Sequence, residues 1–289
     1  LSWAMYTKVR GYETLRLRAD GEVTINYFDT RGLPLDQSHV AEAVAFCMIF
    51  VGESGDDERG NRYRGYLSKY ITKCYDDSVL EWKSHNSEAW HDVERLALVI
   101  KQHIAKNMAG QDVTFTDGYL ELMEMRRNNP SNFNSLIGDL SEDEVYDFST
   151  SEDGRVKIRS LAIAFFEHED FPVHSTLYER MTYGLDPHDK RHPSRDMEIG
   201  SIATALGSWT QSKGINGAIF DGIHNLPIYD QIMGLIGGKG RLNECPVLHI
   251  EMGDLGQNNP VLRQAGGFLV STMARKLTVR LPRSMRKKV

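Results

Sequence analysis

The chain has 289 residues, and its 34 lysines and arginines against 40 aspartates and glutamates give a formal net charge of −6. This length exceeds the usual size of one domain, so it predicts two domains or one large domain with an insertion. The acidic balance argues against a protein whose whole surface coats nucleic acid or an anionic membrane, so any basic patch must be local.

The three cysteines, Cys47, Cys74 and Cys245, lie far apart and form no C-x-x-C pair. We therefore expect reduced thiols in a cytoplasmic protein. No run approaches the roughly 18 consecutive apolar residues that a membrane span needs, and the first ten residues lack the layout of a signal peptide. The start at Leu1 without a methionine suggests a piece of a longer polypeptide.

The first fifty residues have an α/β pattern. Residues 14–18 alternate apolar and charged side chains, Asp20-Gly21 is typical of a turn, and residues 23–28 are rich in β-branched and aromatic side chains. This order predicts two strands that a hairpin could join. Apolar residues then recur at helical spacing over residues 40–51, which predicts a helix with one buried face.

Residues 63–183 carry helix signals and almost no strand signals. Apolar stripes at helical spacing run through residues 90–104 and begin again at Tyr119, and Ser141 with Glu144 forms a possible capping box. The short apolar run over residues 161–166 fits either a helix or a buried strand. We therefore predict an all-helical insertion over residues 53–194.

The last hundred residues return to an α/β pattern. A helix is predicted over residues 194–210, a glycine-rich loop over 213–222 and a buried strand over 246–251. Pro260 then predicts the start of a second helix, because proline is favoured in the first helical turn.

A glycine-rich stretch with one lysine, residues 237–240, resembles a phosphate-binding loop at first sight. No serine or threonine follows Lys239, and the stretch comes after an apparent helix where a phosphate loop follows a strand. A plain helix C-terminal turn is therefore the better interpretation.

Two further patterns suggest metal chemistry. Asp76, Asp77, Glu81 and Lys83 share residue types with metal-dependent nucleases, but their spacing is too short for the usual hairpin and favours a solvated helix face. Four histidines lie at 168, 174, 188 and 192, and the last pair has a zinc-like gap. The prolines that flank this last pair make a regular helix there unfavourable, so loop histidines are the preferred interpretation.

The C-terminal end is basic in an otherwise acidic chain. Seven cationic residues and no acidic one occur after position 274: Arg275, Lys276, Arg280, Arg283, Arg286, Lys287 and Lys288. These side chains could contact DNA phosphates or a neighbouring subunit. Lysine and arginine are also favoured at a helix C-terminus without any such role.

Three segments together resemble the motor domain of the ATPases that energise type IV secretion and conjugative DNA transfer. They are residues 22–35, residues 209–226 with the sequence Gly-Ala-Ile-Phe-Asp-Gly at 217–222, and residues 246–289. No single one of these motifs is specific to the family. The resemblance lies in their order along nearly the whole chain.

The resemblance implies an α/β fold in which a RecA-like core, residues 1–52 and 195–289, is interrupted by the all-α insertion 53–194. It implies ATP and Mg²⁺ as cofactors, a homo-oligomer, in the family a hexamer, and partners in the secretion or conjugation machinery. The location it implies is cytoplasmic or peripheral at the inner membrane. Walker A would precede Leu1 and Walker B would follow Val289, so this chain alone is expected to be inactive as an ATPase.

Five residues are candidates for nucleotide contact under this resemblance. Asn26, Asp29 and Arg31 could line the periphery of the nucleotide. Glu251 and Asp254 lie at the carboxyl end of a predicted strand, where open α/β sheets bind their ligands. Each of the five fits a solvated loop at least as well, and no residue is assigned as catalytic or as a metal ligand.

Two other classes of function remain open. A helical nucleic-acid-binding protein of the nucleoprotein type is favoured by the basic end and opposed by the net charge. A non-enzymatic assembly protein is favoured by the incomplete nucleotide motifs.

Overall fold

The computed structural model describes the backbone of residues 12–16, 23–24, 26–30, 32–52, 58–109, 112–184, 196–210, 220, 226–227, 247–251 and 260–280. Side chains are described for residues 26–30, 32–52, 58–109, 112–184, 196–210, 220 and 260–272.

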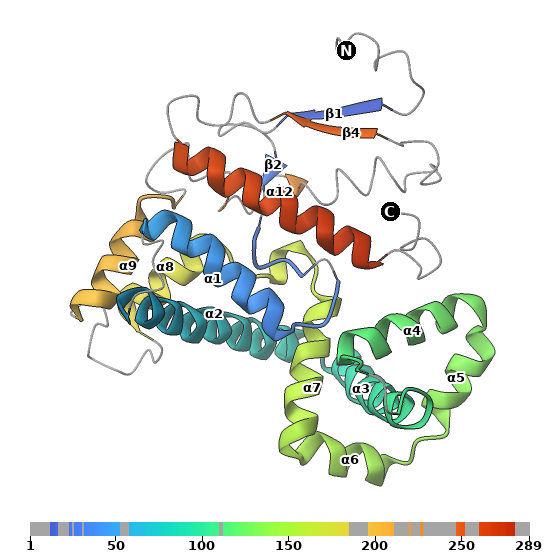
Figure 1. The fold of residues 1–289 in the computed structure, drawn as a ribbon. Helices are drawn as coiled ribbons and strands as arrows, with labels where there is room; N and C mark the ends of the chain where they lie inside the picture. The colour runs from blue at the N-terminus through green and yellow to red at the C-terminus, as the bar shows by residue number, and fades with distance from the viewer. Residues whose placement is uncertain are drawn as a thin grey trace.

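The described elements are mostly helices (Figure 1). The α-helices are α1 (Gln37–Val51), α2 (Glu58–His85), α3 (Ser87–Asn107), α4 (Phe115–Asn128), α5 (Pro130–Gly138), α6 (Glu142–Thr150), α7 (Glu152–Ala162), α8 (His174–Tyr183), α9 (Met197–Gly207) and α12 (Pro260–Arg280). Two short 3₁₀ turns are η2 (Ile163–Phe165) and η3 (His168–Asp170), and four strands are β1 (Tyr12–Arg16), β2 (Val23–Thr24), β3 (Leu226–Pro227) and β4 (Val247–Glu251).

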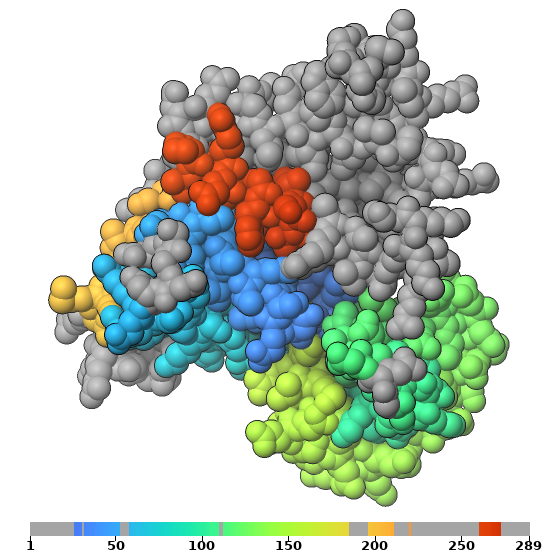
Figure 2. All heavy atoms as spheres, viewed as in Figure 1, coloured from blue at the N-terminus to red at the C-terminus, as the bar shows by residue number. Residues whose placement is uncertain are grey.

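The helices pack in two groups, one around the long helix α2 and one around its successor α3, and α2 contacts α3 and α7 of the second group. In the first group α1 contacts α2, α9 and α12, and α8 packs against α2 and α9. In the second group α3 packs against α4, α5, α6 and α7. Figure 2 shows α12 and α1 side by side on one face of the molecule, with the second group beyond them.

Helix ends are set by local sequence. Asp36 caps α1 by accepting a hydrogen bond from the backbone N–H of His39, and Gly52 ends it at a φ of 72°. The predicted capping box is confirmed, since Ser141 and Glu144 bond reciprocally at the start of α6. The run 161–166, which the sequence left open, forms the end of α7 and the turn η2.

The strands pair differently from the predicted hairpin. β1 lies parallel to β4, with Cα partners running from Tyr12 and Val247 to Arg16 and Glu251. β2 lies parallel to β3, with Val23 opposite Leu226. The hairpin prediction is wrong because each N-terminal strand finds its partner about two hundred residues away. No local turn signal can encode such a pairing.

The predicted α/β fold with a RecA-like core is also wrong. Of the residues whose side chains are described, 82% are helical. The strands of the described part form two separate two-stranded pairs, whereas a core of that type needs one continuous parallel sheet with helices on both faces. Most of the described residues follow the helical spacing of apolar residues in the sequence and form helices. The domain boundaries at 52/53 and 194/195 stay a prediction.

Candidate functional site beside helix α1

Aromatic rings from distant segments meet on α1. Phe46 and Phe50 of α1 contact each other with ring centroids 4.9 Å apart. The rings around them are Tyr27, Trp209, Phe220 and Phe268, with centroids between 4.5 and 6.4 Å from a phenylalanine of α1. Such edge and tilted contacts between rings add to the free energy gained from burial. The cluster fixes α1 as the centre of the first helix group.

A buried hydrogen-bond network ties the segment before α1 to α2. The hydroxyl of Tyr75 donates to the carbonyl of Phe28. His39 Nε2 lies 2.7 Å from the same hydroxyl, and it must donate there because the tyrosine proton is already used. All three groups are buried, so each needs its partner in place of water.

A second histidine network lies on the other side of the aromatic cluster. His174, the first residue of α8, is fully buried and places Nε2 3.0 Å from the carbonyl of Leu206. A carbonyl can only accept, so Nε2 carries the proton. A neutral ring then accepts at Nδ1 from the hydroxyl of Tyr27, 3.2 Å away. The two networks hold residues 26–30 between α1, α2 and α8.

Two buried thiols lie in the same region. Burial raises the pKa of Cys47 to about 12, although a hydrogen bond with Tyr27 opposes this rise. Burial also raises the pKa of Cys74 to about 12, against the opposing charge of Arg180. A thiol of this pKa is neutral at physiological pH, so neither cysteine has the character of a nucleophile or a metal ligand.

The larger of two hollows beside α1 is a groove of about 740 Å³ between α1, α2, α7 and the start of α4. On α2 its lining runs from Arg64 through Ser68 and Thr72 to Val79, which is about 22 Å of helix at 1.5 Å per residue. We call this hollow the α1–α7 groove. Its size is that of a site for a small molecule.

The polar groups of the α1–α7 groove are partly paired with one another. Arg159 of α7 donates to Asp76 of α2 at 2.9 Å, and Lys157 pairs with Asp153. Arg64 donates to the neutral amide oxygen of Asn61. The lining of the groove contains three cationic residues, Arg64, Lys157 and Arg159, and two acidic ones, Asp36 and Asp76.

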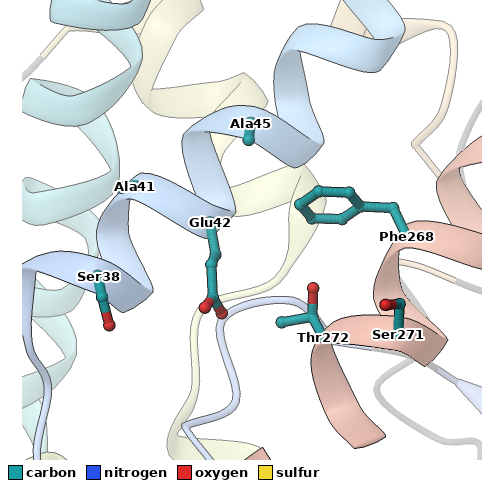
Figure 3. Close-up of a pocket in the computed structure, with 7 residues that line it drawn as sticks. All are labelled: Ser38, Ala41, Glu42, Ala45, Phe268, Ser271 and Thr272. Carbon is teal, nitrogen blue, oxygen red and sulfur yellow. The ribbon is translucent and has the colours of Figure 1, made fainter. Parts of the chain in front are cut away.

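A smaller hollow of about 480 Å³ lies against α12 on the adjoining face of α1, and Ala41 lines both hollows (Figure 3). Its lining residues are Ser38, Ala41, Glu42, Ala45, Phe268, Ser271 and Thr272. Figure 3 shows Glu42 and Thr272 reaching toward the same space from the two helices. Small side chains on α1 leave this gap open.

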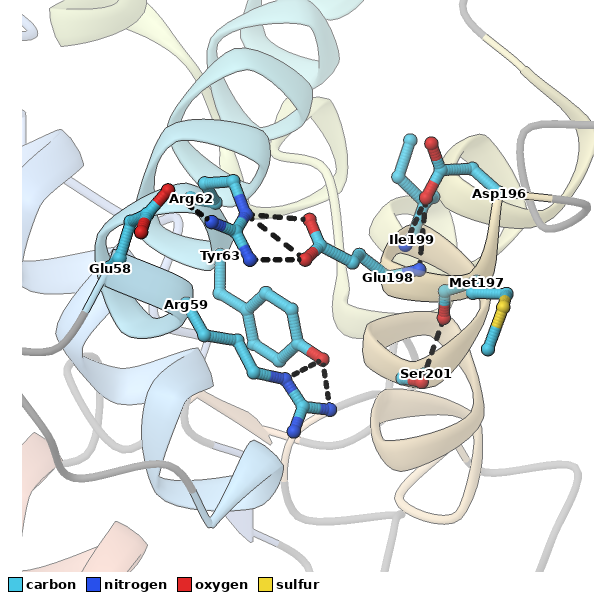
Figure 4. Close-up of polar contacts among 9 residues, drawn as sticks. All are labelled: Glu58, Arg59, Arg62, Tyr63, Asp196, Met197, Glu198, Ile199 and Ser201. Atoms are coloured by element: carbon cyan, nitrogen blue, oxygen red, sulfur yellow. Dashed lines mark hydrogen bonds and ion pairs between the residues drawn. The ribbon is translucent and has the colours of Figure 1, made fainter.

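An ion-pair network joins the first turns of α2 and α9 (Figure 4). The guanidinium of Arg62 contacts both carboxylate oxygens of Glu198, with its closest nitrogen–oxygen distance 2.7 Å, and also contacts Glu58. Glu198 raises the pKa of Arg62. The pair is solvent-exposed, so it orients the two helix ends more than it stabilises them.

The structure gives the five predicted nucleotide contacts separate surroundings. Asn26 is buried, and its side chain donates to the Pro172 carbonyl and accepts from the backbone N–H of Phe28. Asp29 is half-buried in the same turn, with its backbone N–H bonded to the Asn26 carbonyl. Glu251 ends β4, and its side chain is outside the described residues, as are Arg31 and Asp254 altogether. Asn26 is thus a structural residue of the described fold.

The other predicted motifs also take defined places. Asp76 and Asp77 lie on the helix α2, as predicted, but they pair with Arg159 of α7 and Arg180 of α8 instead of facing only solvent. His174 is a buried helix residue and not a loop histidine. The stretch 237–240 and the histidines at 188 and 192 lie outside the described residues.

The basic end is described only in part. Arg275 and Arg280 belong to α12 by their backbone, whereas Arg283, Arg286, Lys287 and Lys288 lie outside the described residues.

No helix of the described residues is long and apolar enough to cross a membrane. Within the same residues, no three histidine, cysteine, aspartate or glutamate side chains come together as a group that could hold a metal ion.

Sequence reasoning missed the α1–α7 groove. Its residues come from α1, α2, α4, α7, η2 and the segment before α1, and each of these segments looks ordinary by itself. Val156 of α7 is 59% accessible at the edge of this groove. This exposure follows from the tertiary packing, so the sequence pattern alone did not indicate the groove.

The chain matches no protein-family model, no curated protein sequence and no solved structure. Its function therefore has to be argued from its own residues.

Proposed function

We propose that this chain is part of an ATP-driven motor of a type IV secretion or conjugative DNA-transfer apparatus. The observation that carries the proposal is the meeting of the three resembling segments at α1. Tyr27 comes from the first segment, Phe220 from the second and Phe268 from the third, and all three rings contact Phe46. Segments that are far apart in the sequence thus pack together. The resemblance implies such packing, because it places the three segments in one motor domain.

The parallel pairing of β1 with β4 supports the same proposal. It brings residues 12–16 against residues 247–251, while the helices α1 to α9 lie between them in sequence. A parallel pair requires a crossover connection, and here this connection contains the helical body. In this proposal the role of the chain in the motor is mechanical. Its helices transmit force, or they make contacts between parts of the apparatus.

ATP and Mg²⁺ are proposed as cofactors through the resemblance alone. Both polar ends of Asn26 are bound within the protein, and the described acidic side chains form no group suited to a metal ion. We therefore derive no step of ATP hydrolysis from these residues.

The proposed partners are further copies of the chain and other proteins of the apparatus, at a cytoplasmic or peripheral inner-membrane location. DNA contact is proposed through Arg275, Arg280, Arg283, Arg286, Lys287 and Lys288. Binding that uses such side chains weakens steeply as salt rises, because cations released from DNA drive it.

The complete reading frame tests the motor proposal. It should encode a Gly-x-x-x-x-Gly-Lys-Ser/Thr loop within about 60 residues before Leu1, and an apolar strand ending in an Asp-Glu pair directly after Val289. The product of that frame should hydrolyse ATP, and a change of the loop lysine to alanine should abolish the activity. A frame without the loop and without the acidic pair would refute the proposal.

A second candidate is a non-enzymatic assembly protein, which the incomplete nucleotide motifs of the printed sequence favour. Such a protein forms a defined oligomer whose mass is the same with and without Mg·ATP. Light scattering on the product of the complete frame measures this mass. A change in mass with nucleotide would support the motor over the assembly protein.

A further inference from the structure

The floor of the α1–α7 groove is apolar and preformed. The buried residues of the lining form this floor: Val44 of α1, Tyr75 and Val79 of α2, and Ile163 of η2, each less than a tenth exposed. All four belong to the hydrophobic core, so the packing of the core holds their side chains in place. A hollow of about 740 Å³ with such a floor is of the size that encloses small organic molecules.

The charged side chains on the α7 wall of the groove are paired within the protein. Arg159 of α7 lies 2.9 Å from Asp76 of α2, and Lys157 of α7 contacts Asp153. Each of these two cations thus has an acid of the same molecule beside it. A ligand would have to break one of these pairs to use either charge.

The charged groups of the lining that come from α1 and α2 are engaged as well. Asp36, which caps α1, accepts hydrogen bonds from the Ser38 hydroxyl and the His39 backbone N–H, and it meets the positive end of the helix dipole. Arg64 donates to the side chain of Asn61 and takes part in a further interaction within the protein. A charged ligand on this floor would therefore lack a counter-charge, and its burial would be costly.

The rest of the lining suits an uncharged molecule. Ser68 and Thr72 lie one turn apart on α2, and both line the groove. A hydroxyl can donate or accept a hydrogen bond, so it suits an alcohol, an amide or a ketone. Val156 lines the edge and is 59% exposed, so contact with the hydrocarbon of a ligand would remove its side chain from water, which is favourable.

We propose that the α1–α7 groove binds a small uncharged organic molecule, with its apolar body on the floor and its alcohol, amide or ketone group toward Ser68 and Thr72. Such a ligand leaves the ion pairs at Asp76 and Asp153 in place and still covers the apolar floor. The proposal is independent of the motor function, since it uses none of the five residues that the resemblance marks for nucleotide contact.

The test is a fluorescence titration of the whole chain with N-phenyl-1-naphthylamine, an uncharged probe whose emission rises in apolar surroundings. We expect saturable binding of one probe per chain. The affinity should change by less than about twofold between about 0.05 and 0.5 M salt, because no charge takes part. 1-Anilinonaphthalene-8-sulfonate, which adds one negative charge to the same ring skeleton, should bind at this site about tenfold more weakly or less tightly still.

Naphthalene derivatives of similar size test the charge and the polar contact by displacement of the probe. The uncharged 1-naphthalenemethanol should displace it, whereas 1-naphthoate and 1-naphthylmethylammonium should each need concentrations at least about tenfold higher. In the double variant Ser68→Ala with Thr72→Val, the alcohol should lose affinity by about threefold to tenfold, as expected for one hydrogen bond. The affinity of 1-methylnaphthalene, which has no hydroxyl, should stay the same.

Tryptophan variants locate the site. Ser68→Trp places a ring in the groove and should abolish probe binding, whereas Ser131→Trp, at an exposed position of α5 outside the groove, should bind like the wild type. Circular dichroism and thermal unfolding of each variant check that it is folded. If Ser68→Trp does not fold, Thr72→Trp, at an exposed position of the same wall, should weaken the probe by about tenfold or more.

Several outcomes would overturn the proposal. These are non-saturable probe binding, probe binding that survives a tryptophan in the groove, and preferential displacement by the naphthoate or the ammonium compound. Self-association of the chain that Ser68→Trp abolishes, measured by light scattering, would also overturn it, because the groove would then be a contact between copies.

Discussion

Gly154, in the first turn of α7, is closely enclosed by its surroundings. A Cβ atom added there would lie 1.8 Å from the carbonyl oxygen of Phe148, which belongs to the backbone of α6 and cannot turn away. We expect Gly154→Ala to lower the free energy of unfolding by about 2–3 kcal/mol, because the junction of α6 and α7 must open to admit it. Urea unfolding followed by circular dichroism measures the change.

Gly65 provides the matched control, since a Cβ atom at this position of α2 meets nothing within 4 Å. Gly65→Ala should raise stability by about 0.5–1 kcal/mol through better helix propensity. A stability loss in both variants would show that the enclosure at Gly154 is not the cause.

The hydroxyl of Tyr75 makes hydrogen bonds with two buried polar groups, the Phe28 carbonyl and the His39 ring. Tyr75→Phe removes the donor to the Phe28 carbonyl and the acceptor for His39, while the ring still fills its place. We expect a loss of about 1–3 kcal/mol in unfolding free energy, since buried polar groups would be left with fewer partners. The same substitution at Tyr146, which is 68% exposed, should leave the urea midpoint unchanged.

The thiols Cys47 and Cys74 make stability depend on pH in the alkaline range. In the folded protein their pKa is about 12, whereas the ordinary value is 9.0. The unfolded chain therefore loses these protons first, so stability should be full below pH 9 and should fall as the pH rises from 9 toward 12. Urea midpoints at pH 8, 9 and 10 measure this decline.

The double variant Cys47→Ala with Cys74→Ala isolates the thiol contribution, because lysine and tyrosine side chains titrate in both proteins. Its midpoint should fall less between pH 8 and 10 than that of the wild type. An identical slope in the two proteins would mean that both thiols ionise freely in the folded state.

Among the elements, the pair β1 and β4 gives the most specific test of the fold. Leu15 and Ile250 are Cα partners in the parallel register. In a variant whose three native cysteines are replaced, Leu15→Cys with Ile250→Cys should be crosslinked by a short bismaleimide in high yield. Leu15→Cys with His249→Cys should react more slowly, because neighbouring strand residues point to opposite faces.

The crosslinked product is measured as a shift in electrophoretic mobility after cleavage of the chain between the two sites. Equal yields from the two pairs would contradict the register. A crosslink between Leu15→Cys and a cysteine introduced within residues 23–28 would instead support the hairpin that the sequence pattern predicted.

At the scale of the whole molecule, we expect the chain as printed not to hydrolyse ATP above background. None of the described residues forms a phosphate-binding loop with a water-activating acid, and residues 237–240 lack the serine or threonine that would hold Mg²⁺. A sensitive phosphate-release assay with the purified chain and with Lys239→Ala measures this. Magnesium-dependent turnover that disappears in Lys239→Ala would contradict the expectation.

The sequence by itself determined most of the helices, because helix formation depends on residues three and four positions apart. The stripe over residues 90–104 gave α3, the spacing over 40–51 gave α1, and Ser141 with Glu144 gave the start of α6. Pro260 likewise gave the start of α12. These features are local, so the printed residues are sufficient to specify them.

Only the tertiary structure decided which elements meet. The partner of β1 lies in β4, and Phe220 and Phe268 reach the same helix α1. The α1–α7 groove collects Arg64 of α2, Phe115 of α4 and Val156 of α7. Each contact depends on the free energy of burying whole faces together and on the entropy of closing long loops. These are properties of the packed molecule, and no short stretch of sequence contains them.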